Sequence, residues 1–399
     1  MSRTEDLMQR AKTRLLENYK QQPVALVRGL GCAVWDADGR EYLDLLGGIA
    51  TCALGHCHPE VVAAAQKQMA TLWHVSNVFY SEPQIELAER IGEASGLPGA
   101  RAFFCNSGAE ANEALIKLAR RAQKDRGQPG RFEVLTFESS FHGRTLATLT
   151  ATAQPKYQQG FEPLPPGFKY APYGDLAAVK AAITAQTAAI LVEPIQGEGG
   201  VRVAPPGYLK GLRALCDEHG LLLMIDEVQT GCGRTGKAFA FQHEGVVPDA
   251  FSLAKSLGNG LPIGAMVCTD AVSKALPSGT HGSTFGGNLV AAAAANVAFR
   301  LSVDPAMLAE TAAKGALALE LGRGIQQRHP GKVKDVRGKG LLFGLELTSP
   351  AAELVTKCRA QGLLVNTAGE HTVRFAPALT VTREQLQDGL GRLEKALQG

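Results

Sequence analysis

The stretch DAFSLAKSLGNGLPIGAM, residues 249–266, places a lysine between a short apolar run and a glycine-rich loop. The run AFSLA (250–254) and the following run GAMVC (264–268) are apolar nearly throughout, as strands buried on both faces are. A lysine beside apolar residues usually extends its ammonium group to water. Lys255 is therefore either a surface residue just past a strand or a functional amine at a sheet edge.

Similar apolar runs recur upstream and are often followed by helical patterns. They are RAFFC (101–105), EVLTF (133–137), AAILV (188–192) and LLLMI (221–225). This alternation predicts an α/β domain with a mainly parallel sheet. In such sheets ligands bind at the carboxyl ends of the strands, so the residues just after these runs are the candidates for a site.

The composition is that of an ordinary globular protein of two or three domains, with 399 residues, 45% hydrophobic and 20% charged. A net charge of +3 without a long basic run argues against a nucleic-acid surface. The first twenty residues are polar, and the longest apolar patch, LVAAAAANVAF (289–299), is too short to span a bilayer. With eight cysteines and no signal-type segment, we expect a cytoplasmic protein with free thiols and no membrane association.

The segment CALGHCHP (52–59) gathers two cysteines and two histidines, Cys52, His56, Cys57 and His58. No second cluster lies at zinc-finger or zinc-ribbon spacing. We therefore expect a tight packed loop here and no metal site.

The C-terminal part predicts a smaller α+β unit. Its expected elements are strands at LLFGLEL (341–347), LLVNTAG (363–369) and HTVRFAP (371–377), a helix at AAELVTKCRAQG (351–362), and a last helix. That last helix opens at Thr382 with Gln385 three residues on, a capping box. The glycine-rich LPSGTHGSTFGGN (276–288) is the expected joint between the units, and its Ser283 and Thr284 are candidate ligand contacts.

NSGAEANEALIKLARR (106–121) opens with a second predicted capping box, Ser107 with Glu110. A helix is therefore expected from about Gly108, with its free N–H groups and positive dipole end at the ligand edge of the sheet. Such a helix start is suited to binding a phosphate, although a plain strand-to-helix turn has the same pattern.

Asp226 follows five apolar residues directly. A carboxylate buried at that position is costly unless a cation meets it, so it either forms a structural pair or holds a positively charged ligand atom. The next residues, Gly231 to Lys237, follow the pattern G-x-x-x-x-G-K of a nucleotide-binding loop. Ala238 replaces the magnesium-binding Ser or Thr, and DEVQT separates the loop from its strand, so a nucleotide-hydrolysing enzyme is only a weak alternative.

An amine, a helix start and a buried carboxylate together match the needs of pyridoxal 5'-phosphate (PLP). Its aldehyde requires an amine, its phosphate a helix N-terminus and its protonated ring nitrogen a carboxylate. Lys255 is then the amine and Asp226 the carboxylate. Lys255 can also act as general acid and base if desolvation lowers its pKa.

The chain resembles the class III (ornithine-type) aminotransferases of fold type I over nearly its whole length. The motifs that occur in the family's order are NSGAEANEALIKLAR, FHGRT, EPIQGEGGV, DEVQTGCGRTGK, LAKSLGNGLPIGAM, HGSTFGGN and VRGKGLLFGLEL. The resemblance implies a large PLP-binding domain with a mainly parallel sheet, at residues 61–275. It implies a small α+β domain built from both termini, residues 1–60 and 276–399.

The resemblance also implies site residues. Gly108 and Ala109, beside Ser107, would bind the cofactor phosphate, and Phe141 would stack on its ring. Asp226 would meet the ring nitrogen, Gln229 the ring hydroxyl, and Lys255 the aldehyde. Thr284 would reach the phosphate of a neighbouring subunit, which implies a homodimer.

Two arginines, Arg144 in FHGRT and Arg374 in HTVRFAP, can each hold a carboxylate through paired hydrogen bonds, as a 2-oxoglutarate-using enzyme needs. The resemblance offers Glu198, in QGEGG, as a removable partner of Arg374. It favours transfer of the terminal amino group of N2-acetyl-L-ornithine to 2-oxoglutarate, as in arginine biosynthesis. Related ω-aminotransferases that act on ornithine, succinylornithine, succinyldiaminopimelate or 4-aminobutyrate are the alternative.

Overall fold

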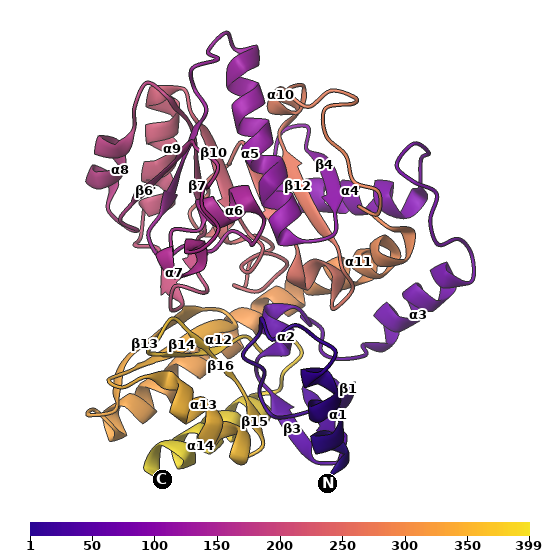
Figure 1. The fold of residues 1–399 in the computed structure, drawn as a ribbon, viewed down its shortest axis with the longest axis vertical. Coiled ribbons are helices and arrows are strands. Elements are labelled where there is room, and N and C mark those ends of the chain that lie inside the picture. The colour runs from indigo at the N-terminus through magenta and orange to yellow at the C-terminus, as the bar shows by residue number, and fades with distance from the viewer.

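The computed structural model describes residues 1–399, and they form two lobes (Figure 1). The upper lobe of Figure 1 is built on a seven-stranded sheet, and the lower lobe contains both chain termini. No single helix is long and apolar enough to cross a membrane. Only α11 (Leu289–Ser302) and α12 (Pro305–Arg328), taken together across a bend of 65°, meet the length and composition required.

The large sheet has the strand order β4-β12-β11-β10-β7-β5-β6. Its strands are β4 (Arg101–Cys105), β5 (Glu133–Phe137), β6 (Phe168–Ala171), β7 (Thr187–Val192), β10 (Leu222–Asp226), β11 (Ala250–Leu253) and β12 (Gly264–Cys268). Only β12 runs antiparallel to its neighbours, so the prediction of a mainly parallel sheet is confirmed. Strand β6 was not predicted, because Lys169 and Tyr170 interrupt its apolar character.

Helices cover both faces of this sheet. On one face α5 (Gly108–Asp125) packs against six of the strands, and on the other lie α4 (Glu82–Ser95), α8 (Leu176–Ala182), α9 (Tyr208–His219) and α11 (Leu289–Ser302). Shorter elements around the sheet are α3 (Pro59–Met69), α6 (Leu146–Ala151), α7 (Pro155–Gln158), α10 (Asp270–Ser273), η1 (Ala240–His243) and η2 (Lys255–Gly258). The side chains of alternate strand residues enter separate cores on the two faces.

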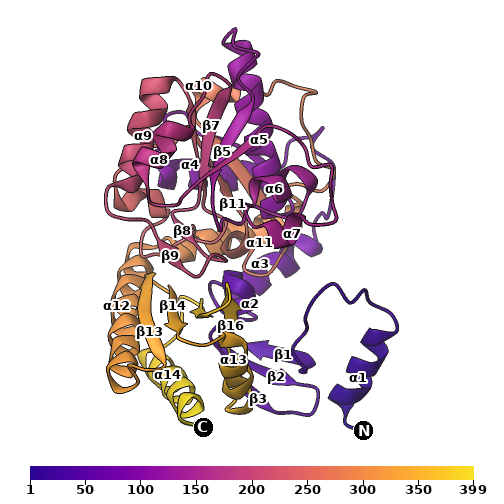
Figure 2. The same cartoon turned by 60° about the vertical axis from the view of Figure 1, so that its left-hand side comes forward.

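The lower lobe has two four-stranded sheets. The first joins β1 (Leu26–Leu30), β2 (Ala33–Asp36), β3 (Glu41–Asp44) and β15 (Leu363–Leu364), and the second joins β13 (Val333–Lys339), β14 (Leu342–Leu347), β17 (Thr372–Phe375) and β16 (Asn366–Ala368). Its helices are α1 (Arg3–Lys12), α2 (Gly47–Ala50), α12 (Pro305–Arg328), α13 (Ala351–Ala360) and α14 (Arg383–Gln398), while β8 (Ile195–Gln196) pairs with β9 (Arg202–Val203) beside the upper lobe. Figure 2 shows α1 set apart from the rest of the lobe by a long connection.

Residues from both ends of the chain share one hydrophobic core in this lobe. Leu43 and Leu45 pack there with residues between Ala318 and Leu397. Strand β15 pairs in parallel with β3, with Leu363 opposite Leu43. Helix α11 instead packs against α3 and α4 and contributes to the upper core. The predicted domain limits, a large domain at 61–275 and a small domain built from 1–60 and 276–399, stay a prediction.

Two local predictions have different outcomes. The Thr382 capping box is confirmed, since Gln385 N donates to Thr382 Oγ1 at 3.1 Å and Thr382 N donates to Gln385 Oε1 at 3.0 Å. The single strand predicted over residues 363–369 is wrong. Buried Val365 separates two short strands, β15 and β16, which belong to different sheets. The chain changes sheet there because both sheets cover the same core.

The cysteine and histidine segment at 52–59 is a tight loop. His56 Nε2 lies 2.7 Å from Asp44 Oδ2, and hydrogen bonds to Asp44 and to the Cys52 side chain raise the pKa of His56 to about 10. A protonated His56 therefore ties this loop to the end of β3. No group of three or more histidine, cysteine or acidic residues in the structure is arranged to hold a metal ion.

Candidate active site

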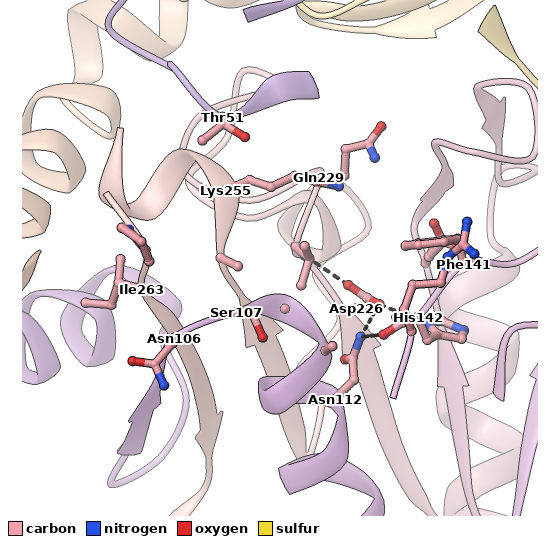
Figure 3. Close-up of a pocket in the computed structure, with 18 of the residues that line it drawn as sticks. Thr51, Asn106, Ser107, Asn112, Phe141, His142, Asp226, Gln229, Lys255 and Ile263 are labelled. Atoms are coloured by element: carbon pink, nitrogen blue, oxygen red, sulfur yellow. Dashed lines mark hydrogen bonds and ion pairs between the residues drawn. The ribbon is translucent and has the colours of Figure 1, made fainter. Parts of the chain in front are cut away.

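A cavity of about 400 Å3 lies at the carboxyl ends of the parallel strands (Figure 3). Residues that follow five strands line it together: Asn106, Ser107, Gly108 and Ala109 after β4, Phe141, His142, Gly143 and Arg144 after β5, Glu193 after β7, Asp226, Val228 and Gln229 after β10, and Ala254 and Lys255 after β11. Thr51, from the lower lobe, completes one wall. The structure therefore brings most of the predicted site residues to one place.

Helix α5 directs its N-terminus at this cavity. Ser107 Oγ accepts a hydrogen bond from Glu110 N at 3.2 Å, as predicted. The other half of the predicted capping box is wrong, because the Glu110 carboxylate accepts from Asn106 N at 2.9 Å instead of from Ser107 N. A Cβ on Gly108 would lie 2.8 Å from Val228 Cγ1, so glycine is needed for the helix start to approach the loop after β10. The first N–H groups of α5, without partners in the helix, are suited to bind an anion.

Asp226 is held by side chains that the sequence reasoning missed. Asn112 Nδ2 donates to Asp226 Oδ2 at 2.7 Å, and His142 Nδ1 lies 2.8 Å from the same oxygen. Val228 N donates to Asp226 Oδ1 at 3.0 Å. Asp226 is only 4% exposed. The carboxylate is thus fixed by three different segments of the upper lobe and directed at the cavity (Figure 3).

Both missed residues have a signal in the sequence. Asn112 lies four residues after Gly108, so a helix that begins at Gly108 places it on the same side, one turn further in. His142 precedes Gly143 and Arg144 in the loop after β5, one of the strand ends inspected as candidates. These two positions in the sequence therefore indicate an amide and an imidazole close to the carboxylate at the strand end.

Lys255 begins the single turn η2 with φ of +38°, a backbone conformation that non-glycine residues rarely adopt. Such strain persists only where the surroundings enforce it, and it concentrates at functional sites. Burial lowers the pKa of Lys255, and the nearby Arg374 acts in the same direction, against the opposing effect of Glu198 and Asp226. Its amine therefore loses its proton more readily than that of a surface lysine.

Glu193 is a second buried carboxyl group on the cavity wall. Burial and then the charge of Asp226 raise the pKa of Glu193 well above its usual range. Glu193 Oε2 accepts a hydrogen bond from Phe141 N at 2.9 Å. This shift favours the neutral form of Glu193, which limits the negative charge beside Asp226, while its Oε2 fixes the backbone at Phe141.

Arg374 reaches the same edge from β17 in the lower lobe. Its guanidinium forms an ion pair with Glu198, and its Nη1 donates to Gln229 Oε1 at 3.2 Å. Its Nε donates to Asn366 Oδ1 at 3.2 Å, whereas its buried Nη2 has no partner. Burial raises the pKa of Glu198, but Arg374 and Lys255 outweigh it, so the pKa is lowered overall. The charged pair therefore adjoins the cavity through Gln229.

Three other predicted residues have different surroundings. Arg144 lines the cavity, is exposed, and lies 4.0 Å above the Tyr157 ring, so its guanidinium is oriented but open to a ligand. Ser283 does not line the cavity, although its Oγ accepts from Nδ2 of Asn106, a lining residue, at 3.3 Å. Thr284 is exposed and lines a separate hollow with Asn77. The chain's own Thr284 is therefore outside its own cavity.

The loop Gly231–Lys237 does not form a nucleotide-binding site. A phosphate-binding loop needs a helix N-terminus after it, and here only the single 3-10 turn η1 follows. Arg234 in this loop is fully buried between the lobes, where it donates to the carbonyl of Leu341. The weak nucleotide-hydrolysing alternative is therefore wrong.

The cavity, with its lysine, its buried carboxylate and its helix start, has the geometry of an aminotransferase site. The family model for aminotransferase class-III matches residues 16–397, and the chain belongs to this family. It is similar to the acetylornithine aminotransferase of Myxococcus xanthus, with 64% identity over 96% of each chain. It is therefore an enzyme of the aminotransferase type, in a family that uses PLP.

Solved structures agree with this assignment. The N-acetylornithine aminotransferase of Stenotrophomonas maltophilia K279a has a TM-score of 0.83 and 40% identity, covering 95% of this chain and 97% of that one. A structure of the ornithine aminotransferase of Toxoplasma gondii, with partial occupancy of PLP at the active site, has a TM-score of 0.93 and 34% identity, covering 98% and 94%. The predicted fold type I architecture is thereby confirmed.

Proposed function

We propose that the enzyme transfers the terminal amino group of N2-acetyl-L-ornithine to 2-oxoglutarate, giving N-acetyl-L-glutamate 5-semialdehyde and L-glutamate in arginine biosynthesis. The observation that supports this most directly is the Arg374–Glu198 ion pair beside Lys255. A terminal amine has no carboxylate on its reacting carbon, so this substrate needs the arginine neutralised. The other substrate, 2-oxoglutarate, needs it free. The names of the similar proteins from Myxococcus and Stenotrophomonas support the acyl-ornithine substrate.

The residues present fit PLP as the cofactor. The helix start at Gly108 and Ala109, capped by Ser107, would hold its phosphate, Phe141 would cover its ring, and Gln229 would meet its hydroxyl. Asp226 would pair with its ring nitrogen, since the carboxylate faces the cavity and its other contacts come from behind. When bound, PLP supplies an electron sink for the carbon that loses a proton.

The residues of the chain provide the remaining chemistry. Lys255, with its lowered pKa, takes up and returns the proton at the reacting carbon. Glu198 holds Arg374 while the amine substrate reacts. The carboxylate of 2-oxoglutarate then displaces Glu198 and pairs with Arg374 through two hydrogen bonds, one to the unpartnered Nη2. Arg144, exposed at the other side of the cavity, binds the second carboxylate of 2-oxoglutarate or the α-carboxylate of acetylornithine.

Steady-state assays with 2-oxoglutarate test the substrate. We expect acetylornithine to have a kcat/KM at least about tenfold above those of ornithine, succinylornithine, succinyldiaminopimelate and 4-aminobutyrate, the discrimination that about 1.4 kcal/mol gives. A higher value for one of the other amines would assign the enzyme to a related ω-aminotransferase activity. A value near zero for all five would overturn the proposal.

We further propose a cytoplasmic homodimer. An apolar surface supports the dimer: Trp73, Val78, Phe79, Tyr80 and Phe285 are each more than half exposed. Thr284 lies next to Phe285, so covering this surface with a second copy brings Thr284 towards the partner's site. Light scattering after gel filtration should give twice the chain mass. A monomer that retains full activity would overturn this arrangement.

A further inference from the structure

Arg234 is a fully buried arginine that contacts the lower lobe. It lies in the loop between β10 and η1, and its Nη1 donates to the carbonyl oxygens of Leu341 and Pro377. Its own carbonyl oxygen accepts a hydrogen bond from Leu341 N at 3.0 Å. One residue of the upper lobe thus forms hydrogen bonds to two segments of the lower lobe.

Those two segments are the adjoining ends of the strand pair that holds Arg374. Strands β14 and β17 are antiparallel, with Gly344 opposite Arg374 and Phe343 opposite Phe375. Leu341 directly precedes β14 and Pro377 follows β17 by two residues, so both carbonyls lie at one end of the pair. Arg234 therefore fixes the end of the pair nearest to Arg374.

The loop that contains Arg234 touches Arg374 at a second point. Gln229, five residues earlier, accepts from Arg374 Nη1 at 3.2 Å. The loop thus meets β17 both at the side chain of Arg374 and at the backbone three residues later. Two contacts from one loop define where the guanidinium lies relative to the cavity.

The local backbone is shaped for this close approach. A Cβ on Gly340 would lie 2.6 Å from the carbonyl oxygen of Arg234, and one on Gly233 would lie 2.3 Å from that of Ser302. Both glycines have positive φ, which other residues rarely adopt. Glycine at 340 lets the loop and the turn before β14 meet, and glycine at 233 lets the loop approach the end of α11.

The charge of Arg234 has no acidic partner. It forms none of the ion pairs in the structure, and its Nε and Nη2 have no hydrogen-bond partner. Burial lowers the pKa of Arg234 to about 10, so the group remains charged at neutral pH. Keeping an unpaired buried cation is costly, and a purely structural contact to carbonyls could be made by a neutral donor.

We infer that Arg234 is a positioning residue for substrate recognition: it holds the β14–β17 pair so that Arg374 meets Gln229 and Glu198 at the edge of the cavity. This inference rests on the proposed function and deepens it, because it assigns the geometry of the carboxylate-binding arginine to a residue of the other lobe. It also gives the glycine-rich loop 231–237 a role.

Arg234→Lys tests the inference on the holoenzyme, because lysine keeps the charge and one donor but cannot reach two carbonyls in the same geometry. We expect the KM for 2-oxoglutarate to rise by about tenfold to a hundredfold, as a displacement of about 1 Å at a binding group can cause. The single-turnover rate with acetylornithine should change less than about threefold. The dissociation constant of glutarate, a dicarboxylate that cannot react, should rise by the same factor as that KM. If Arg234→Lys fails to fold, Arg234→Gln, which keeps an N–H donor, is measured with the same expectation.

Two matched controls separate positioning from general damage. Lys237→Met alters an exposed residue of the same loop and should leave both constants unchanged. Lys314→Met removes another buried cation that donates to backbone carbonyls, those of Leu379 and Val381, just beyond β17. It should lower the melting temperature without a selective rise in the KM for 2-oxoglutarate. An equal selective rise in Lys314→Met would overturn the inference.

A double-mutant cycle decides whether Arg234 acts through Arg374. In an Arg374→Ala background, Arg234→Lys should raise the glutarate dissociation constant less than about twofold further. Independent effects that multiply in the double variant would overturn the inference while leaving the proposed function intact. If Arg374→Ala alone leaves glutarate binding unchanged, then the carboxylate-binding role in the proposed function is wrong, and the inference falls with it.

Discussion

The two carboxylates that serve the cavity are held in opposite ways. Asp226 is almost completely buried, and Asn112, His142 and Val228, all from the upper lobe, hold its oxygens. Glu198 is 22% exposed at its side chain and pairs with Arg374 from the lower lobe, with Gln229 Nε2 at 3.5 Å. The first carboxylate is held by several fixed contacts, whereas the second is the partner that we propose a substrate carboxylate replaces.

Under the proposed function, this difference would let one site accept two unlike substrates. A group that acts in both half-reactions stabilises developing charge best when it is fixed, because fixed dipoles need no rearrangement as the charge develops. A group that serves one half-reaction must be exchangeable, so its contacts must be few and partly open to solvent. Lys255 interacts with both carboxylates, since the charges of Glu198 and Asp226 both act on its pKa.

Lys255→Ala removes the amine that interacts with both Asp226 and Glu198, and it has the largest expected effect. It should abolish multiple turnover, a loss beyond the roughly 10⁴-fold that proton transfer alone accounts for. The fold and cofactor binding should persist, because the phosphate and ring contacts come from other segments. Absorbance titration with PLP and a melting curve check this. Near-normal turnover in the variant would remove Lys255 from the mechanism.

Asp226→Ala removes the carboxylate that is held by fixed contacts within the upper lobe. The loss of a charge pair in a buried site is of the order of 3–5 kcal/mol, or roughly two to four decades in rate if it acts in the transition state. Both half-reactions should slow together, since both need the ring nitrogen charged. Rapid-mixing single-turnover rates measure this, with Asp226→Asn as the isosteric control. A variant that only unfolds, with full activity per folded molecule, would make Asp226 a structural carboxylate.

Glu198→Ala removes the carboxylate that we propose 2-oxoglutarate displaces, so its effects on the two half-reactions should be unequal. We expect the acetylornithine half-reaction to slow by about tenfold to a hundredfold, the cost of about 1.4–2.8 kcal/mol for a stranded arginine. Binding of 2-oxoglutarate should be equal or tighter, and activity toward α-amino acids such as glutamate should rise. Single-turnover rates of both half-reactions decide the outcome. Equal losses with no gain for glutamate would mean that Glu198 is a structural loop residue.

The Asp44–His56 pair extends the comparison, as a half-buried pair that lies outside the cavity. The raised pKa of His56, about 10 against an ordinary 6.5, means that its stabilisation is fully present below pH 6.5. It declines as the pH rises and is lost near pH 10. His56→Asn should therefore lower the melting temperature by a few degrees at pH 6 and by progressively less towards pH 10. His371→Asn, a control at a half-buried histidine, should show no such trend. A difference that is constant with pH would exclude the charged pair.

The fold was predictable wherever one local signal sufficed. Continuous apolar runs such as LLLMI predicted the buried strands, and Thr382 with Gln385 predicted the start of α14. Pairing between distant segments was not predictable, because nothing local distinguishes Leu363, which joins β3, from Asn366, which joins β17. The Glu110 carboxylate accepts from the backbone N–H of Asn106 and from the Ser107 hydroxyl instead of from the backbone N–H of Ser107, and this choice depends on backbone angles that the sequence leaves open.

The candidate site also contains some residues that local sequence signals predicted and others that they did not. The strand-end positions identified Asp226 and Lys255 from chemistry alone, because ligands gather at that edge. Glu198 and Arg374 came from the family resemblance, since an arginine in a strand is commonly a surface ion pair. The supports of Asp226 were missed because Asn112 and His142 act through a carboxylate. The loop 231–237 was compared with a nucleotide-binding loop because of its glycine spacing, whereas Arg234 within it contacts backbone carbonyls that no spacing reveals.

The lower core, which both ends of the chain complete, has a consequence for synthesis. Leu43 leaves the ribosome long before Leu363, its partner across β3 and β15. At about 5–20 residues per second, translation delays that pairing by tens of seconds, while the whole upper sheet can already form. During this interval β3 is an uncovered edge strand, able to pair with other nascent chains. Premature termination after Ser302 would make that exposure permanent. Truncated chains should therefore aggregate through their N-terminal strands, and chaperones should be needed chiefly by the first fifty residues to emerge.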